Sequence, residues 1–240
     1  MAMRVAAGVL GAALVALAPA VAHAQGVVSE YSDLTDETVI ESPVWGVWEL
    51  LAVGPYQPDA IGDVGSSLEG LADDRGPLLA TELDFFIFHI PYVGPVGAGV
   101  RAGWAKFDGP AFDERTGEPS ENRNTKVTIF PITPMAVLRV NVLARELDFP
   151  VIFTGKIGLH MIPWRSSTGG RSDGSDIEFG LRWAAQVALE LDFLEPRAAR
   201  MLDEEWGINH SFIFGEVFGS TASGGFGDSF AWAAGLGFVF

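Results

Sequence analysis

Seventeen consecutive residues, Ile177 to Phe193, alternate between two sets of side chains without interruption. The first set is apolar throughout: Ile177, Phe179, Leu181, Trp183, Ala185, Val187, Leu189, Leu191 and Phe193. The second set is polar, charged or small: Glu178, Gly180, Arg182, Ala184, Gln186, Ala188, Glu190 and Asp192. Successive side chains of a β-strand point to opposite faces, whereas a helix would mix the two sets on each face. The segment therefore predicts a long β-strand with one apolar face.

Seven further runs show a β-like pattern, although the register of the sixth of them is ambiguous. They are Val44–Val53, Leu79–Ile90, Val96–Phe107, Lys126–Ala144, Val151–Met161, Ile208–Gly219 and Phe230–Phe240. The longer polar connections (54–77, 108–125, 164–176 and 219–228) all fall on one side of an antiparallel array. This pattern predicts an all-β fold, an eight-stranded antiparallel up-and-down transmembrane β-barrel, with one short helix at 194–207 in a periplasmic connection.

The last run carries no charged residue, and its large side chains fall on one face. These are Phe230, Trp232, Leu236, Phe238 and Phe240. The opposite face is small, which leaves room for bulky charged side chains from neighbouring strands. With its terminal phenylalanine, the segment resembles the closing strand of bacterial outer-membrane barrels. That resemblance implies insertion into outer-membrane lipid through the barrel assembly machinery.

The N-terminus predicts export. Arg4 precedes an uncharged apolar run that ends in Ala22-His23-Ala24, a small-x-small cleavage pattern. We expect residues 1–24 to be a cleaved signal peptide of a Gram-negative cell-envelope protein, 25–42 a polar segment and 43–240 the barrel. A retained membrane anchor is the weaker alternative, because the run is rich in alanine and contains glycine and proline. The chain has no cysteine, which excludes disulfides, thiolate metal sites and a cysteine-linked lipid anchor.

The mature chain is strongly acidic. Removing residues 1–24 leaves 14 Lys and Arg against 31 Asp and Glu, a net charge of −17. Such a field repels nucleic acid, so no nucleic-acid partner is expected. The remaining length suits one barrel without a second domain, and we expect a monomer whose external partner the sequence does not identify.

The polar faces of the predicted strands carry charges of both signs. The set is Glu49, Glu82, Asp84, Glu178 and Glu190 with Arg101, Arg139, Lys156 and Arg182. An eight-stranded barrel is only wide enough for its own side chains to fill it, and unpaired buried charges are costly. The expectation is a charge-paired, closed lumen in a protein with a structural or surface-interaction role.

Three other functions remain open. The same charges would line a narrow channel, or the fold would be a soluble lipocalin-like barrel with a ligand cavity. A lipid-modifying or proteolytic barrel enzyme would use His89, His160 or His210, and His160 would need a nucleophile from another strand. His210 cannot activate Ser211 in a regular strand, because adjacent side chains point apart. No motif supports catalysis, so we assign no catalytic residue, cofactor or metal site.

Several stretches together resemble one known family. They are Glu41-Ser-Pro with Gly54-Pro-Tyr-Gln-Pro58, Leu194-Glu-Pro-Arg-Ala-Ala-Arg200, and Trp206-Gly-Ile-Asn-His210. They are similar to predicted outer-membrane β-barrel proteins of myxobacteria and relatives. The resemblance spans the mature chain and implies the barrel fold and an outer-membrane location. It implies no activity, and no functional residue carries over.

Overall fold

The computed structural model describes residues 44–54, 78–112, 119–147, 149–227 and 230–240, within one compact unit, Ile40–Phe240. The predicted signal peptide, the polar segment 25–42 and most of the 54–77 connection lie outside these residues.

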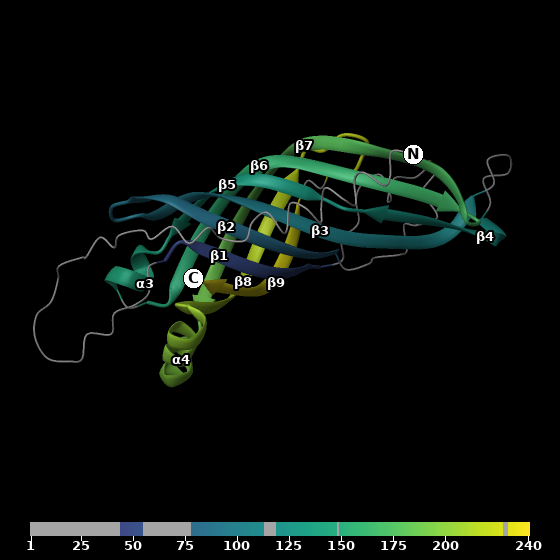
Figure 1. Cartoon of the computed structure of the whole chain (residues 1–240). Helices are drawn as coiled ribbons and strands as arrows, with labels where there is room; N and C mark the ends of the chain where they lie inside the picture. The colour runs from purple at the N-terminus through teal and green to yellow at the C-terminus, as the bar shows by residue number, and fades with distance from the viewer. Residues whose placement is uncertain (1–43, 55–77, 113–118, 148, 228–229) are drawn as a thin grey trace, which may run out of the picture. The chain divides into compact units, whose positions relative to one another are not determined.

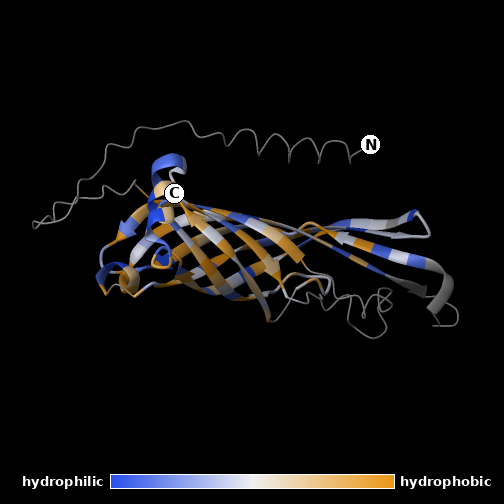
Figure 2. Cartoon of the chain, turned by 90° about the horizontal axis from the view of Figure 1, so that it is seen from below, coloured by the Kyte–Doolittle hydropathy of each residue, from blue (hydrophilic) through white to orange (hydrophobic). Residues whose placement is uncertain are grey.

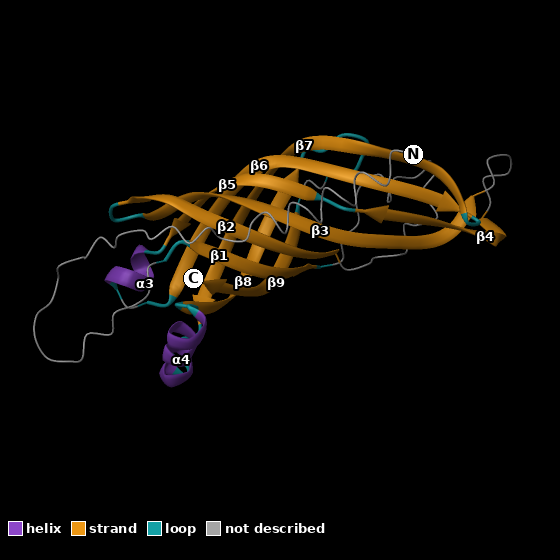
Figure 3. Ribbon diagram, in the orientation of Figure 1, coloured by secondary structure: helices purple, strands orange, loops and turns teal. Residues whose placement is uncertain are grey.

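The described strands close into a ring (Figure 1, Figure 3). They are β1 Gly46–Val53, β2 Leu78–Ile90, β3 Gly94–Phe112, β4 Pro119–Ile129, β5 Ile132–Val140, β6 Val151–Thr168, β7 Arg171–Glu190, β8 His210–Ser220 and β9 Ala231–Val239. Every neighbouring pair is antiparallel, and β9 pairs with β1 to close the ring. Because β4 and β5 both lie between β3 and β6, they share one position. The predicted antiparallel up-and-down barrel of eight strands is confirmed.

The predicted single strand at 126–144 is divided in the structure. β4 ends at Ile129 and β5 begins at Ile132, because Pro131 has no backbone N–H to continue the ladder. The short segment between β4 and β5 remains hydrogen-bonded to β3, because the Gly103 N–H donates to the Pro131 carbonyl at 2.8 Å. The run also ends early as a strand, since a short helix begins at Val142.

Four strands continue past the ring (Figure 1). β2 stops pairing with β3 at Trp104, and β8 stops pairing with β7 at Arg182. Beyond these points β3, β4, β6 and β7 remain paired side by side, as two hairpins. The loops predicted at 108–125 and 164–176 are thus largely strand. Polar side chains there indicated loops, because even the buried face of these strands carries small polar residues, Thr125 and Ser166.

The turn of the second hairpin shows why these strands continue so far. Gly169 and Gly170 have φ values of 55° and 82°, which suit a tight two-residue turn between strands. We call the end of the ring that carries this turn the hairpin end, and the opposite end the helix end.

The helix end carries two helices, α3 Val142–Glu146 and α4 Pro196–Trp206. α4 matches the predicted helix, with Pro196 in its first turn and a left-handed Gly207 after its last. The Ile208 N–H donates to the Leu202 carbonyl at 3.1 Å and the Gly207 N–H to the Asp203 carbonyl at 3.0 Å, so carbonyls of the last turn keep partners. The single predicted helix was incomplete, since α3 is a second one. Neither described helix has the length and apolar character needed to cross a membrane.

Phenylalanine rings fill the space beside the small inner face of β9. A side-chain carbon at Gly237 would collide with the Phe212 ring, and one at Gly235 would approach the Phe214 ring at 2.7 Å. Both rings come from β8 and are buried. The expected charged side chains are present too, since buried Glu49 is paired with Gly237 and buried Glu216 with Ala233, but β8 adds aromatic rings that were not expected.

Candidate functional site: the charged core of the barrel

Lys156 on β6 meets three glutamates inside the ring. Its Nζ lies 2.8 Å from Glu49 Oε2 on β1, 2.5 Å from Glu82 Oε1 on β2 and 3.3 Å from Glu216 Oε2 on β8. All four side chains are buried. Strands from opposite parts of the ring are therefore joined through one ammonium group, which no pair of adjacent strands could achieve.

Arg101 on β3 forms the second centre of the same network. Its Nη1 and Nη2 donate to the two carboxylate oxygens of Glu216 at 2.5 and 2.6 Å, and its Nε donates to Glu82 Oε2 at 2.5 Å. Such bidentate guanidinium–carboxylate pairs are the strongest and most directional of the ion pairs. Gln186 Nε2 donates to Glu49 Oε1 at 2.8 Å, so neighbouring polar groups also satisfy the carboxylates.

Glu216 was missing from the predicted lumen residues, although it contacts both Lys156 and Arg101. The register of the run 208–219 was ambiguous in the sequence, because Glu216 lies on the same face of the strand as Phe212, Phe214 and Phe218. All four are buried on the inner face of β8. One signal could have placed it, because a charged side chain is disfavoured on the lipid face of a membrane barrel.

Arg182 extends the network toward the hairpin end. Its guanidinium carbon lies 3.7 Å from the centroid of the Phe218 ring, a cation–π contact, and its Nη2 is 3.9 Å from Glu216 Oε1. A hollow lined by Arg101, Lys156 and Arg182 is too small to admit a water molecule. The side chains around this hollow thus leave no room for water between them.

Three predicted lumen residues do not contact this network, and a fourth, Asp84, lies beside its carboxylates without an ion pair. Glu190 accepts from Arg145 Nη2 on α3 at 2.8 Å, and Glu178, which is only partly buried, accepts from Ser223 Oγ at 2.5 Å. Asp84 and Arg139 are buried inside the ring, but each keeps one polar atom without a hydrogen-bond partner among the described residues. The expected pairing of all nine charges is therefore incomplete.

Three carboxylates of the core approach one another. Oxygens of Glu49, Glu82 and Asp84 lie within 4.8 Å, a spacing that three metal ligands would have. However, the Lys156 ammonium already contacts Glu49 and Glu82, and Arg101 contacts Glu82. A divalent cation would have to lie beside these positive groups, so the cluster functions as the acidic half of an ion-pair network.

His160 lies against a serine, the contact that an enzyme reading required. Its Nδ1 is 2.7 Å from Ser220 Oγ on β8. The imidazole is buried, however, and its Nε2 has no partner among the described residues, so no described carboxylate orients the ring. Ser220 Oγ also accepts from the Ala222 N–H at 3.2 Å. The His160–Ser220 hydrogen bond therefore resembles a structural contact between β6 and β8 rather than a catalytic pair.

Unlike His160, the other two histidines form no hydrogen bond to a serine hydroxyl among the described residues. His210 points inward and its Nδ1 lies 2.5 Å from Asp192 Oδ2, while Ser211 faces the other way. His89 lies near the end of β2, at the helix end. Within the described residues, these contacts assemble no triad.

The outer surface of the ring is apolar. Its exposed side chains include Trp48, Leu50, Leu79, Val100, Trp104, Leu138, Phe153, Ile157, Leu159, Leu181, Trp183, Val187, Ile213, Trp232 and Leu236. In the ring itself, which ends where β2 and β8 stop pairing, no Asp, Glu, Lys or Arg occupies an outward position of the described strands. Exposed charges such as Lys126 and Arg165 lie beyond it, on the strands that continue into the hairpins. Figure 2 shows the resulting contrast between apolar ring strands and more hydrophilic hairpins and α4.

Comparison with known proteins shows only distant similarity. No family model matches the chain, and no curated protein matches it. Solved structures that are similar include Ail, the attachment invasion locus protein of Yersinia pestis (15% identity, TM-score 0.40). The N-terminal β-barrel domain of Pseudomonas aeruginosa OprF (10%, 0.45) and Neisserial surface protein A (11%, 0.45) are similar as well. Each similarity covers 82% of this chain and 97% of the other. Similarity at this level carries no conclusion about activity, and the strand pairing of this chain itself establishes the barrel.

Proposed function

We propose that this protein is an integral outer-membrane β-barrel with a closed lumen, whose role is structural or interactive at the cell surface. Residues 1–24 would direct export and be removed, and the terminal strand would be read by the barrel assembly machinery. The mature protein would act as a monomer, with the hairpin end outside the cell and the helix end in the periplasm.

The uncharged outer surface of the ring is the observation that carries the proposal. A soluble protein rarely exposes so continuous an apolar surface, whereas a membrane barrel needs an apolar band around its whole circumference. Trp48, Trp104 and Trp232 are exposed on this outer face rather than inside a cavity. A lipocalin-like barrel would have the opposite arrangement, with an apolar cavity inside and polar groups outside.

The ion pairs of Lys156 and Arg101 support a closed lumen. A conducting pore would leave its lining charges solvated and separated, so that ions could pass between them. Here the charged groups touch one another across the ring, at 2.5–3.3 Å for the Lys156 contacts. These contacts favour the closed barrel over a narrow channel.

We predict that the purified protein forms no stable channel. Reconstituted into a planar bilayer, it should leave the membrane at its baseline conductance under an applied voltage, because the paired side chains block the path. A known porin, added to the same bilayer afterwards, provides the positive control. Reproducible single-channel steps from this protein would contradict the closed lumen.

The orientation is tested by labelling the second hairpin. A short epitope inserted between Gly169 and Gly170, where the turn requires no side-chain contact, should bind antibody on intact cells. The same epitope placed after Gly207, which ends α4 at the opposite end of the barrel, should bind only after the outer membrane is opened. Detection of the second epitope but not the first on intact cells would reverse the proposed orientation.

A further inference from the structure

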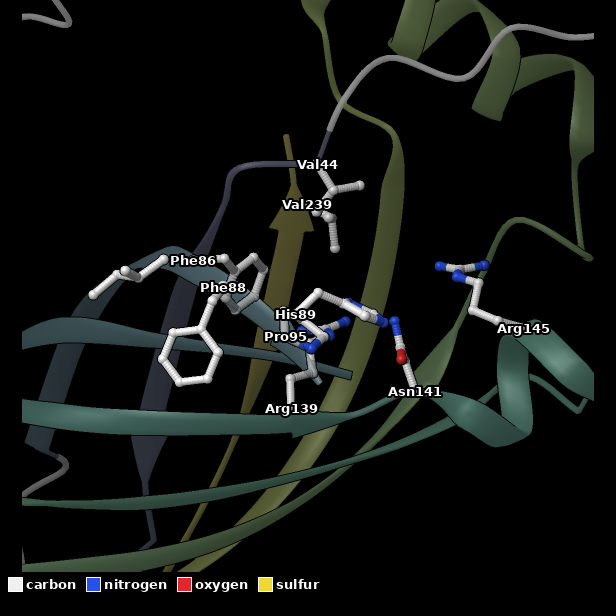
Figure 4. A pocket seen from close by; sticks show the side chains of 10 residues that line it. Val44, Phe86, Phe88, His89, Pro95, Arg139, Asn141, Arg145 and Val239 are labelled. Atoms are coloured by element: carbon white, nitrogen blue, oxygen red, sulfur yellow. The ribbon is translucent and has the colours of Figure 1, made fainter. Parts of the chain in front are cut away.

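A cavity opens at the helix end of the barrel (Figure 4). Its volume is about 440 Å³, within the range of small-molecule sites. It is separate from the ion pairs of Lys156 and lies between the ends of β2, β3, β5 and β9 and the start of α3. Its lining residues are Val44, Phe86, Ile87, Phe88, His89, Pro95, Arg139, Asn141, Arg145 and Val239.

Arg139 is the residue that points to a ligand. Its side chain lines the cavity although the residue is only 4% exposed. Its guanidinium carbon lies 4.7 Å from the centroid of the Phe212 ring, which covers one side. Its Nη2 is buried and has no hydrogen-bond partner among the described residues. The carboxylates of Glu49, Glu190 and Asp84 act on the guanidinium only from beyond ion-pair distance. A buried guanidinium without a direct partner is costly, and an anion in the cavity would give it a closer one.

The polar groups around Arg139 converge on the same space. Figure 4 shows His89, Asn141 and Arg145 arranged around the cavity together with Arg139. Arg145 Nη2 is held by Glu190 at 2.8 Å, which positions the side chain and neutralises part of its charge. No Asp or Glu is among the described residues that line the cavity. The lining therefore retains a net positive charge and several hydrogen-bond donors.

The rest of the wall is apolar. Phe86, Phe88, Pro95 and Val239 face the cavity beside the polar group. A bare inorganic ion would leave this surface uncovered, whereas a ligand with an apolar body would cover it. We propose that the cavity binds an amphipathic anion, with a carboxylate or phosphate group at Arg139 and Asn141 and an apolar body against the phenylalanines.

Binding is tested on the full chain folded in a zwitterionic detergent. Benzoate and phenyl phosphate, titrated by calorimetry, should bind saturably, and benzamide, which has a similar shape without the charge, should bind far more weakly. Arg139→Gln should weaken benzoate binding about tenfold or more, because the charged hydrogen bonds are lost. Asn141→Ala and Arg145→Gln should weaken it in the same direction, and they keep the test valid if Arg139→Gln does not fold.

Lys106→Gln is the matched control, since Lys106 is half exposed and belongs to the β3 hairpin at the other end. It should bind benzoate as the unaltered protein does. The proposal is overturned if benzoate does not bind saturably, if benzamide binds equally well, or if the Arg139, Asn141 and Arg145 variants keep the original affinity.

The anionic group could belong to a free molecule or to a lipid headgroup. Nanodiscs of phosphatidylcholine alone and with added phosphatidylglycerol separate the two. If benzoate binds more weakly in the anionic nanodiscs, and if this difference disappears in the Asn141 and Arg145 variants, the headgroup is the ligand. Unchanged binding identifies a soluble ligand. Neither result depends on whether the lumen conducts, so this proposal and the closed barrel can fail separately.

Discussion

Replacing Lys156 by methionine is expected to lower the free energy of unfolding by about 3–5 kcal/mol. The substitution leaves the carboxylates of Glu49, Glu82 and Glu216 close together. Arg101 still contacts Glu82 and Glu216, but Glu49 keeps only the neutral Gln186. Methionine has nearly the same length, so lost charge rather than lost volume dominates the effect. Urea unfolding of the detergent-folded protein, followed by circular dichroism, measures the change.

Two further variants distinguish loss of the buried ion pairs from the effect of replacing any lysine by methionine. Lys126→Met removes an exposed lysine in β4, 3.9 Å from Asp108, and should change the stability by no more than about 0.5 kcal/mol. Adding Glu49→Gln to Lys156→Met should restore part of the loss, because one uncompensated carboxylate disappears. If Lys156→Met unfolds at the urea concentration of the unaltered protein, the ion pairs do not stabilise the barrel.

Introducing arginine at Leu236 is expected to cost about 2–4 kcal/mol of stability in a lipid bilayer and to reduce the yield of inserted protein. Leu236 lies on the outer face of β9, 49% exposed, between Leu50 of β1 and Ile213 of β8. A guanidinium there would have to lie in hydrocarbon, with apolar neighbours on both sides. Folding yield into liposomes and urea titration of the inserted protein both report the effect.

The control adds the same charge outside the ring. Asn124 is an exposed residue of β4, in the first hairpin, and Asn124→Arg should insert with the normal yield. A soluble barrel would accept arginine equally at both positions, since each side chain would face water. Equal yields and equal stabilities for the two variants would therefore contradict membrane insertion.

Much of the barrel could be predicted from the alternation of side chains. The inner or outer position of Glu49, Glu82, Arg101 and Lys156 follows directly from a period of two, because a strand leaves only two faces. The helix α4 was also predictable, since Pro196 and Gly207 mark its two ends.

The boundaries were harder to predict where the chain leaves the apolar band. The hairpins beyond the ring are held by backbone hydrogen bonds between β3, β4, β6 and β7. One face of these strands is buried, but from Thr125 and Ser166 outward even its residues are polar, so this stretch appeared as loops. α3 was missed for a related reason, as its five residues are too few to show a helical period.

Alternation along each strand identified most of the inward-facing residues, although the ambiguous register of 208–219 hid Glu216. Which inward residues meet follows only from the three-dimensional arrangement of the strands. The vertical position of each residue depends on the stagger between strands, and that stagger brings Lys156 to three glutamates of three different strands. It leaves Arg139 beside a cavity instead. The alternation of side chains within one strand carries no information about its offset from the neighbouring strands. A network of inward charges could therefore be predicted, but not which charged residues pair in it.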